Sequence, residues 1–201
     1  MPQLITIQHT LESIVDPFDP PQNRIPGWHV TDLKKAADAI AKGQEVPNGG
    51  WEFDGDTTGL MAWGRMWEAA IRPWVTDYSS RMGFQATFSN VIEADGIIGN
   101  LDGLLYTSSG EALSILEMKA TTTADTNPLL KPNWMCQCKA YCHMVGVNQV
   151  WFLVLHMPRR GAPEARVYQH MITFEDWEIA ENWQMLKGTK EYLESKGIKL
   201  W

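Results

Sequence analysis

Three ionisable residues, Asp102, Glu117 and Lys119, lie on two neighbouring apolar runs of the sequence. The first run is IIGNLDGLLY (97–106), and the second, ALSILEMKAT (112–121), follows after a short Thr-Ser-Ser-Gly turn. Two carboxylates can hold a hard divalent cation through their oxygens, while an ammonium faces an anionic group or an attacking water. The combination is suited to hydrolysis of a phosphodiester.

The spacing of Glu117 and Lys119 is informative only in a strand. An acidic residue two positions before a lysine also occurs at Asp32-Leu33-Lys34 and at Glu194-Ser195-Lys196, but both of these lie in segments with helical periodicity. Residues i and i+2 share a face in a strand and not in a helix. We therefore place the site at Glu117 and Lys119, with Met118 on the opposite face. On this pattern alone, an ordinary hairpin with solvated charges remains an equal alternative.

Length and composition predict a single α/β domain. The chain has 201 residues, of which 44% are hydrophobic, and no linker divides it. We expect one domain over 1–201, with an irregular and helical extension at 1–57, a core at 58–173 and a C-terminal helix at 174–201. No apolar run is long enough to span a membrane, and the N-terminus lacks the features of a signal peptide, so the prediction is an intracellular, cytoplasmic protein.

The charge and the cysteines exclude several classes of site. A net charge of −7 argues against a large nucleic-acid-binding surface, though not against a small groove. The three cysteines, Cys136, Cys138 and Cys142, are an odd and clustered set without a fourth metal ligand of their kind. We expect them to be small buried thiols. No glycine-rich phosphate loop of the ATPase type is present, so ATP hydrolysis is not expected.

The elements that must position the site follow from periodicity, caps and turn residues. The predicted order is a helix at 32–42, a helix at 58–82, strands at 84–93, 97–106 and 112–120, a helix at 132–145, strands at 148–157 and 165–172, and a helix from 174 to 195.

Several details of these elements are also predicted. Thr31 is the expected cap of the first helix and Thr173 that of the last, which would break at Gly188. Pro73 should kink the long helix. One buried face of that helix should carry Trp63, Trp67, Ala70 and Trp74.

Two further motifs make the pattern specific. Gly64-Arg65-Met66-Trp67-Glu68 lies on the helix before the strands, and Gln137-Cys138-Lys139-Ala140-Tyr141 lies on the helix after them. Gln137 and Tyr141 are four residues apart, so both should project from one helix face. With these motifs, residues 60–157 resemble the PD-(D/E)xK nuclease superfamily, in its RecB-like and lambda-exonuclease-like (YqaJ-type) branch. The strand before Asp102 departs from the pattern, since it has Gly99-Asn100-Leu101 where many members have a proline.

The resemblance implies a fold and a set of roles. The fold would be a restriction-endonuclease-like α/β core, a mixed central sheet flanked by helices. Asp102, Glu117 and the Met118 backbone carbonyl would hold Mg²⁺ or Mn²⁺, and Glu68 would complete the set. Lys119 would orient or help deprotonate a water, with a pKa lowered by a nearby cation and partial burial.

The same resemblance implies a substrate. Gln137 and Tyr141 would position a DNA strand, and we add Arg65 as a substrate-binding residue. Among the tryptophans, Trp51 or Trp134 could stack on bases.

The leading functional prediction is a metal-dependent DNA exonuclease of the phage recombination or repair kind, acting on a linear duplex or single strand. The alternatives are a structure-specific or restriction-type endonuclease on the same fold, and a DNA-binding module without catalysis. Under the leading prediction, a homo-oligomer and a single-strand annealing or recombination partner protein are compatible with the sequence. Host cytoplasm is then the expected location of a phage-encoded enzyme, and no membrane partner is expected.

Overall fold

The computed structural model describes residues 25–51, 55–122, 127–156 and 166–201, with the backbone alone for 55–63. In chain order its elements are β1 (Trp28–His29), α1 (Val30–Ala41), α2 (Gly55–Arg81), β2 (Gln85–Ala94), β3 (Ile97–Tyr106), β4 (Ala112–Thr121), the 3-10 turn η2 (Pro128–Leu130), α3 (Pro132–Val145), β5 (Gln149–His156), β6 (Arg166–Thr173) and α4 (Asp176–Ser195).

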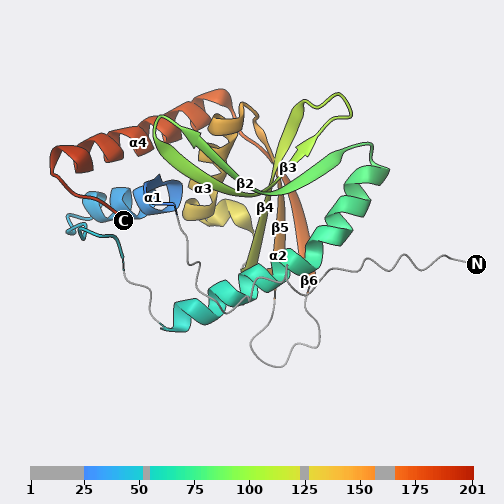
Figure 1. The fold of residues 1–201 in the computed structure, drawn as a ribbon, viewed down its shortest axis with the longest axis horizontal. Helices are drawn as coiled ribbons and strands as arrows, with labels where there is room; N and C mark the ends of the chain where they lie inside the picture. Colours follow the sequence, from blue (N-terminus) through green and yellow to red (C-terminus); the bar gives the residue numbers. More distant parts are fainter. Residues whose placement is uncertain (1–24, 52–54, 123–126, 157–165) are drawn as a thin grey trace, which may run out of the picture.

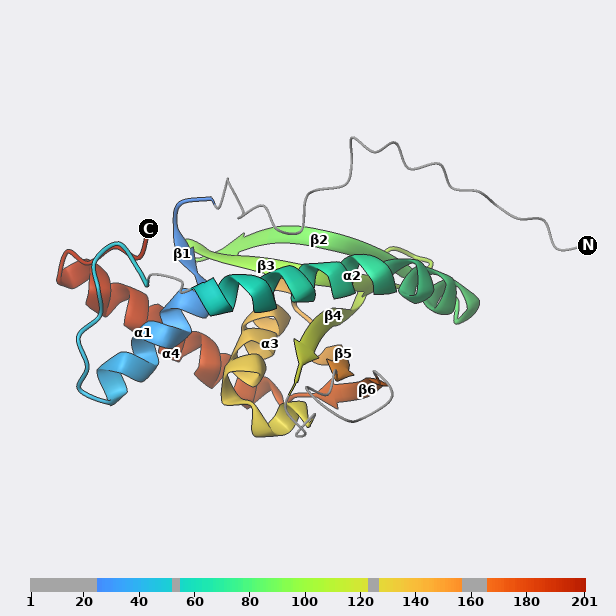
Figure 2. The same cartoon turned by 90° about the horizontal axis from the view of Figure 1, so that it is seen from below.

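A mixed six-stranded sheet forms the centre of the fold, in the order β1-β3-β4-β5-β6 with β2 also paired to β3. Helices α1, α3 and α4 gather on one side of this sheet, and α2 runs across the other (Figures 1 and 2). The predicted mixed α/β sheet flanked by helices is therefore confirmed. In the part of the chain that the structure describes, no helix is both long and apolar enough to cross a membrane.

Strand β4 separates two hydrophobic cores because both of its faces are covered. Ile115 packs into the core beneath α1, α3 and α4. Leu116 and Met118 pack into the second core, beneath α2. Alternation along the strand then directs Glu117 to the same side as Ile115, toward α3. A near-continuous apolar run is what a strand buried on both faces requires.

The central strands and α3 agree with the sequence prediction to within one or two residues. Helix α3 starts with Pro132 in its first turn and ends at Gly146, whose φ of 78° is left-handed. The two strands predicted after it correspond to β5 and β6. The short strand β1, with only two residues, had no signal in the sequence.

The helix ends and one helix face differ from the prediction. His29, without a side-chain cap bond, precedes α1 where Thr31 was expected, and the predicted break at Gly188 is absent because α4 is continuous there. The capping box of α4 is formed by Glu175 and Glu178, which replaces the expected cap at Thr173.

The face that helix α2 turns to the sheet agrees with the predicted face only in part. Trp67 packs against the second core, as predicted, together with Ile71. The helix runs through Pro73, and Ala70 and Trp74 are exposed, whereas Val75 and Ser79 are buried. The side chain of Trp63, the fourth residue of the predicted face, lies outside the described part.

The two strands that carry the predicted site separate at the site itself. β3 and β4 are antiparallel, and their pairing runs to Gly103 opposite Leu116. The next residues on the two strands are Asp102 and Glu117. β2 pairs with the other edge of β3 along most of its length, and β1 pairs with β3 at Ile97 and Ile98. Among the described strands, the β3 edge is therefore unpaired over residues 99–102, between β1 and β4.

Candidate active site

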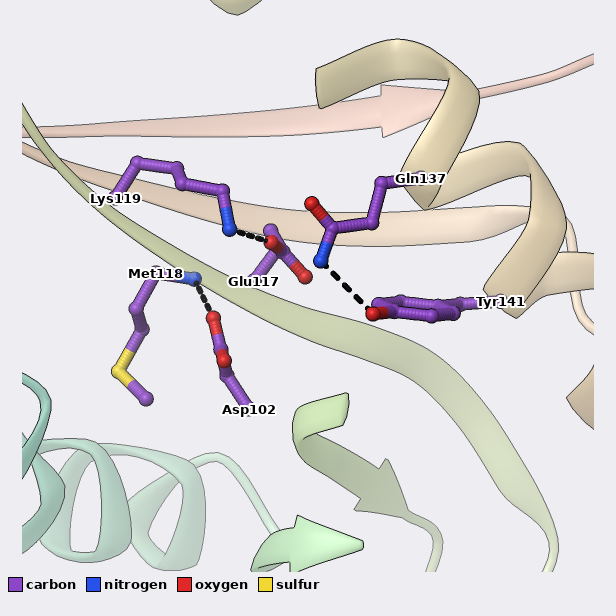
Figure 3. A network of polar contacts seen from close by, with 6 residues as sticks. All are labelled: Asp102, Glu117, Met118, Lys119, Gln137 and Tyr141. Carbon is purple, nitrogen blue, oxygen red and sulfur yellow. Dashed lines mark hydrogen bonds and ion pairs between the residues drawn. The ribbon is translucent and has the colours of Figure 1, made fainter. Parts of the chain in front are cut away.

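Asp102 lies where β3 and β4 separate, next to the last paired residue Gly103. Its Oδ2 accepts a hydrogen bond of 2.7 Å from the backbone N–H of Met118, so a carboxylate takes the place of a strand carbonyl at the point of divergence (Figure 3). This bond ties Asp102 to the backbone of the residue between Glu117 and Lys119. The predicted grouping of Asp102 with the Glu-Met-Lys tripeptide is therefore present in the structure.

Glu117 and Lys119 point to the α3 side of β4 and form an ion pair (Figure 3). The Lys119 ammonium donates to Oε1 of Glu117. The Glu117 side chain is 0% exposed, and its other oxygen, Oε2, is buried without a hydrogen-bond partner. A buried carboxylate oxygen without a partner costs free energy, and such an oxygen is available as a ligand.

Glu68 approaches the same cluster from α2. Its side chain is 25% exposed, and its carboxylate lies 4.0 Å from the guanidinium of Arg72, one helical turn further along. The charge of Asp102 acts on Glu68, and so does that of Lys119. The structure thus brings the predicted Glu68 within electrostatic reach of the residues on β3 and β4.

Burial opposes the ionisation of all three carboxyl groups, and the charge of Asp102 adds to this effect at Glu68 and Glu117. Burial raises the pKa of Glu117 to about 8, and the charges of Asp102 and Glu68 add to this effect. Burial also raises the pKa of Glu68 to about 7, again with a contribution from Asp102. Burial raises the pKa of Asp102, although the charge of Lys119 and the hydrogen bond from the Met118 N–H lower it. The cluster has more negative charge than its surroundings compensate.

The pKa of Lys119 shifts in the opposite direction from the one predicted from the sequence. Burial by itself would lower its pKa, but the charges of Glu117 and Asp102 outweigh burial and raise the pKa above its ordinary value. The expected lowering is wrong for the protein without a bound cation, because the sequence did not show how closely two carboxylates surround the ammonium. Lys119 is therefore a hydrogen-bond donor and a positive charge here.

Gln137 and Tyr141 lie on one face of α3, as their spacing predicted. The Gln137 side-chain amide donates to the Tyr141 hydroxyl at 2.8 Å (Figure 3). Tyr141 is only 2% exposed, and a Cβ on Gly99 would lie 2.9 Å from its ring. Glycine at position 99 therefore lets the ring rest on β3, and the ring in turn supports Gln137. Tyr141 reaches the site through Gln137.

The other predicted binding residues are placed less directly. Arg65 is half-buried, and its charge lowers the pKa of Glu68, so it lies near the cluster. Trp134 stacks on Phe152 at 5.6 Å, and Trp51 packs against the core. Base stacking by these two tryptophans is not supported. The prediction of buried thiols is confirmed, since all three cysteines are buried and free.

Two residues that lie beside the site, Arg72 and Ser89, were not among the site residues predicted from the sequence. Arg72 follows Glu68 by four positions, a spacing that places the two on one helix face and that was available as a signal. Ser89 has a φ of 56°, and no sequence pattern marks a serine that adopts this conformation.

The donor set is chemically suited to a divalent cation. Asp102, Glu117 and Glu68 supply the oxygens that Mg²⁺ and Mn²⁺ prefer, and Glu117 Oε2 is a buried oxygen without a partner. Within the described ranges, no three such side chains are already gathered at metal-binding distance. A bound cation and the role of the Met118 carbonyl stay predictions.

Comparison with known proteins identifies the fold. The crystal structure of an alkaline exonuclease, LHK-Exo, from Laribacter hongkongensis matches with a TM-score of 0.55 and 14% identity, over 85% of this chain and 89% of that chain. The structure of LHK-Exo in complex with dAMP matches with a TM-score of 0.54 and 15% identity, over 85% and 89% of the two chains. No protein-family model and no curated protein sequence matches this chain. At these identities the likeness shows the fold alone, and that fold agrees with the one that the sequence resemblance implied.

Proposed function

We propose that this chain is a metal-dependent deoxyribonuclease, an exonuclease that hydrolyses phosphodiester bonds of linear DNA. The observation that carries the proposal is the buried cluster of Asp102, Glu117 and Glu68 with the Lys119 ammonium among them, at the point where two strands separate. A likeness of fold to an alkaline exonuclease supports the choice of exonuclease.

Each residue of the cluster has a role in this mechanism. Asp102, Glu117 and Glu68, with the Met118 carbonyl, would hold Mg²⁺ or Mn²⁺, which when bound lowers the pKa of a water and offsets phosphate charge. Lys119, as an ammonium, donates to the attacking water or to the phosphate and places positive charge where negative charge develops. Gln137, supported by Tyr141, offers an amide to the DNA backbone.

Burial of the cluster strengthens these interactions. Glu117 is fully buried and Lys119 is 22% exposed, so water screens their charges weakly. A phosphate that approaches from the exposed side would meet the ammonium first. Lys119 would then leave Glu117 Oε1 for the substrate, which frees a second oxygen of Glu117.

The proposal is tested by incubating the full chain with a labelled linear duplex, a linear single strand and a closed circle, each with Mg²⁺, with Mn²⁺ and with EDTA. We expect cleavage of linear DNA that depends on the metal, with the circle left intact. Cleavage of the circle would instead identify an endonuclease. Binding without cleavage of any substrate would identify a DNA-binding module.

Two isosteric variants connect the activity with the cluster. Asp102→Asn can still accept the Met118 N–H, and Lys119→Met keeps an unbranched side chain of nearly the same length without its charge. Both should lose at least about a hundredfold in rate, the scale expected for one electrostatic group of an active site. Asp77→Asn, at an exposed position near the C-terminal end of α2, is the matched control and should keep full activity. Wild-type rates in both cluster variants would show that the chemistry occurs elsewhere.

A further inference from the structure

Strand β2 is distorted opposite Asp102. Phe88 pairs with Gly103 and Asn90 pairs with Leu101, so the register places Ser89 across from Asp102. Ser89 has a φ of 56°, in the left-handed region that a non-glycine residue rarely adopts, least of all in a strand. Strain of this kind persists where the surrounding structure enforces it, and it concentrates at functional sites.

The distorted serine holds Arg72 of α2. The Arg72 guanidinium donates to the Ser89 hydroxyl at 2.7 Å and lies 5.4 Å from the centre of the Phe88 ring. The same guanidinium is 4.0 Å from the Glu68 carboxylate. Two residues of β2 and one of α2 therefore fix an arginine beside the carboxylate cluster.

Within the described part of the chain, most of the hydrogen-bonding capacity of Arg72 is unused. A guanidinium has five N–H donors, and Ser89 takes one of them. The contact with Glu68 is at the limit of an ion pair, and the Arg72 side chain remains 35% exposed. Two other cations of the structure are committed more closely, since Arg81 lies 2.6 Å from Asp77 and Lys139 lies 2.9 Å from Glu178.

The position of Arg72 suits an anion that approaches the cluster. Its charge reaches both Asp102 and Glu68, since it lowers the pKa of each. A planar guanidinium with adjacent free donors fits the two non-bridging oxygens of a phosphate.

We propose that Arg72, fixed by Ser89 and Phe88, binds a backbone phosphate of the DNA strand next to the carboxylate cluster. This assignment rests on the proposed nuclease function. The proposal also explains the distortion of β2, because the left-handed conformation of Ser89 places its hydroxyl where it accepts a hydrogen bond from the Arg72 guanidinium.

The test measures binding of a short fluorescein-labelled duplex to the full chain in EDTA, over a range of salt concentrations. Arg72→Gln should weaken binding about tenfold or more and reduce the slope of log affinity against log salt by about one, the value for one lost phosphate contact. Arg72→Lys should keep the slope but recover only part of the affinity. Arg81→Gln removes an equal charge from an exposed position on the same helix and should leave the slope unchanged.

A charge-free phosphate shows whether the contact is direct. Methylphosphonate is placed at one phosphate of the duplex at a time, and each duplex is measured with wild type and with Arg72→Gln. At the phosphate that Arg72 contacts, methylphosphonate should weaken the binding of wild type but not that of Arg72→Gln. Ser89→Ala should weaken binding less than Arg72→Gln, with the slope preserved, because the charge remains while its support is lost.

The outcomes separate this proposal from the proposed function. Suppose that wild type cleaves DNA. If Arg72→Gln then keeps the wild-type salt slope, or if every methylphosphonate weakens binding equally in wild type and in Arg72→Gln, the role of Arg72 is refuted and the nuclease function is not. If wild type binds DNA without cleaving it, and one methylphosphonate loss disappears in Arg72→Gln, the proposed nuclease function is refuted and the phosphate contact of Arg72 is supported. If wild type binds no DNA, both are overturned.

Discussion

The cost of ionising Glu68 in its partly buried setting predicts that removing this carboxylate stabilises the protein. The substitution is Glu68→Gln, which keeps the shape of the side chain and removes its charge. The pKa of Glu68 rises from an ordinary 4.5 to about 7 in the folded protein, chiefly through burial. The folded state therefore retains a proton that the unfolded chain releases as pH rises from 4.5 to 7, and wild-type stability falls over this window.

The size of the effect follows from the pKa shift. A shift of one pKa unit corresponds to about 1.4 kcal/mol, so the ionised Glu68 destabilises the folded protein by up to about 3 kcal/mol above pH 7. The lost contact with Arg72 offsets little of this, because a partly exposed pair at that distance contributes under about 1 kcal/mol. We expect Glu68→Gln to be more stable than wild type by about 2 to 3 kcal/mol at pH 8 and nearly equal to it at pH 4.5.

The assay is urea unfolding followed by tryptophan fluorescence, at pH 4.5 and pH 8 in EDTA. For a chain of this size the gain at pH 8 corresponds to a rise of about 4–12 °C in Tm. Asp77→Asn, at an exposed position of α2, should change stability by less than about 0.5 kcal/mol at either pH. If Glu68→Gln were no more stable than wild type at pH 8, or if its advantage were the same at both pH values, ionisation of Glu68 would not destabilise the folded protein.

Three more predictions follow from the site and its supports. Ser89→Gly and Ser89→Ala both lose the hydroxyl, but only glycine accepts the positive φ freely, so the glycine variant should be more stable in urea unfolding by about 1 kcal/mol; equal stabilities would contradict the strain. Gly99→Ala should cost about 1–3 kcal/mol because its Cβ meets the Tyr141 ring, whereas Gly64→Ala meets nothing and should gain up to about 1 kcal/mol; a harmless Gly99→Ala would show that the ring has room. Mn²⁺ affinity measured by calorimetry should rise about tenfold or more from pH 6 to pH 8, because the carboxyls of Glu117 and Glu68, with a pKa of about 8 and about 7, must release protons to bind a cation; an affinity independent of pH would contradict the ligand set.

The sequence predicted the central sheet well because its strands are buried and their pattern is continuous. β3, β4 and β5 agree with prediction to within one or two residues, and the strand context correctly selected Glu117 and Lys119 over the two helical matches. Asp32 and Lys34 do lie in α1, where they cannot share a face. The site residues were readable because their types and spacing are local features.

What the sequence did not show depends on contacts between distant segments. The pKa of Lys119 depends on Asp102 across the gap between two strands, and the buried face of α2 depends on where the helix meets the sheet. The strained Ser89 and the support of Tyr141 by Gly99 are likewise products of packing. A single sequence without a template does not specify such contacts.

The bond from the Met118 amide to Asp102 makes one backbone proton a spectroscopic probe of the site. Its neighbours in β4 pair with β5 from Ile115 to Thr121, whereas the Met118 N–H donates to a side-chain carboxylate. If Asp102 turns toward a cation, this proton loses its acceptor while the rest of the strand stays in place. A shift of this amide signal in NMR, larger than the shifts of the adjacent Glu117 and Lys119 amides, would then record occupation of the site in solution without any turnover.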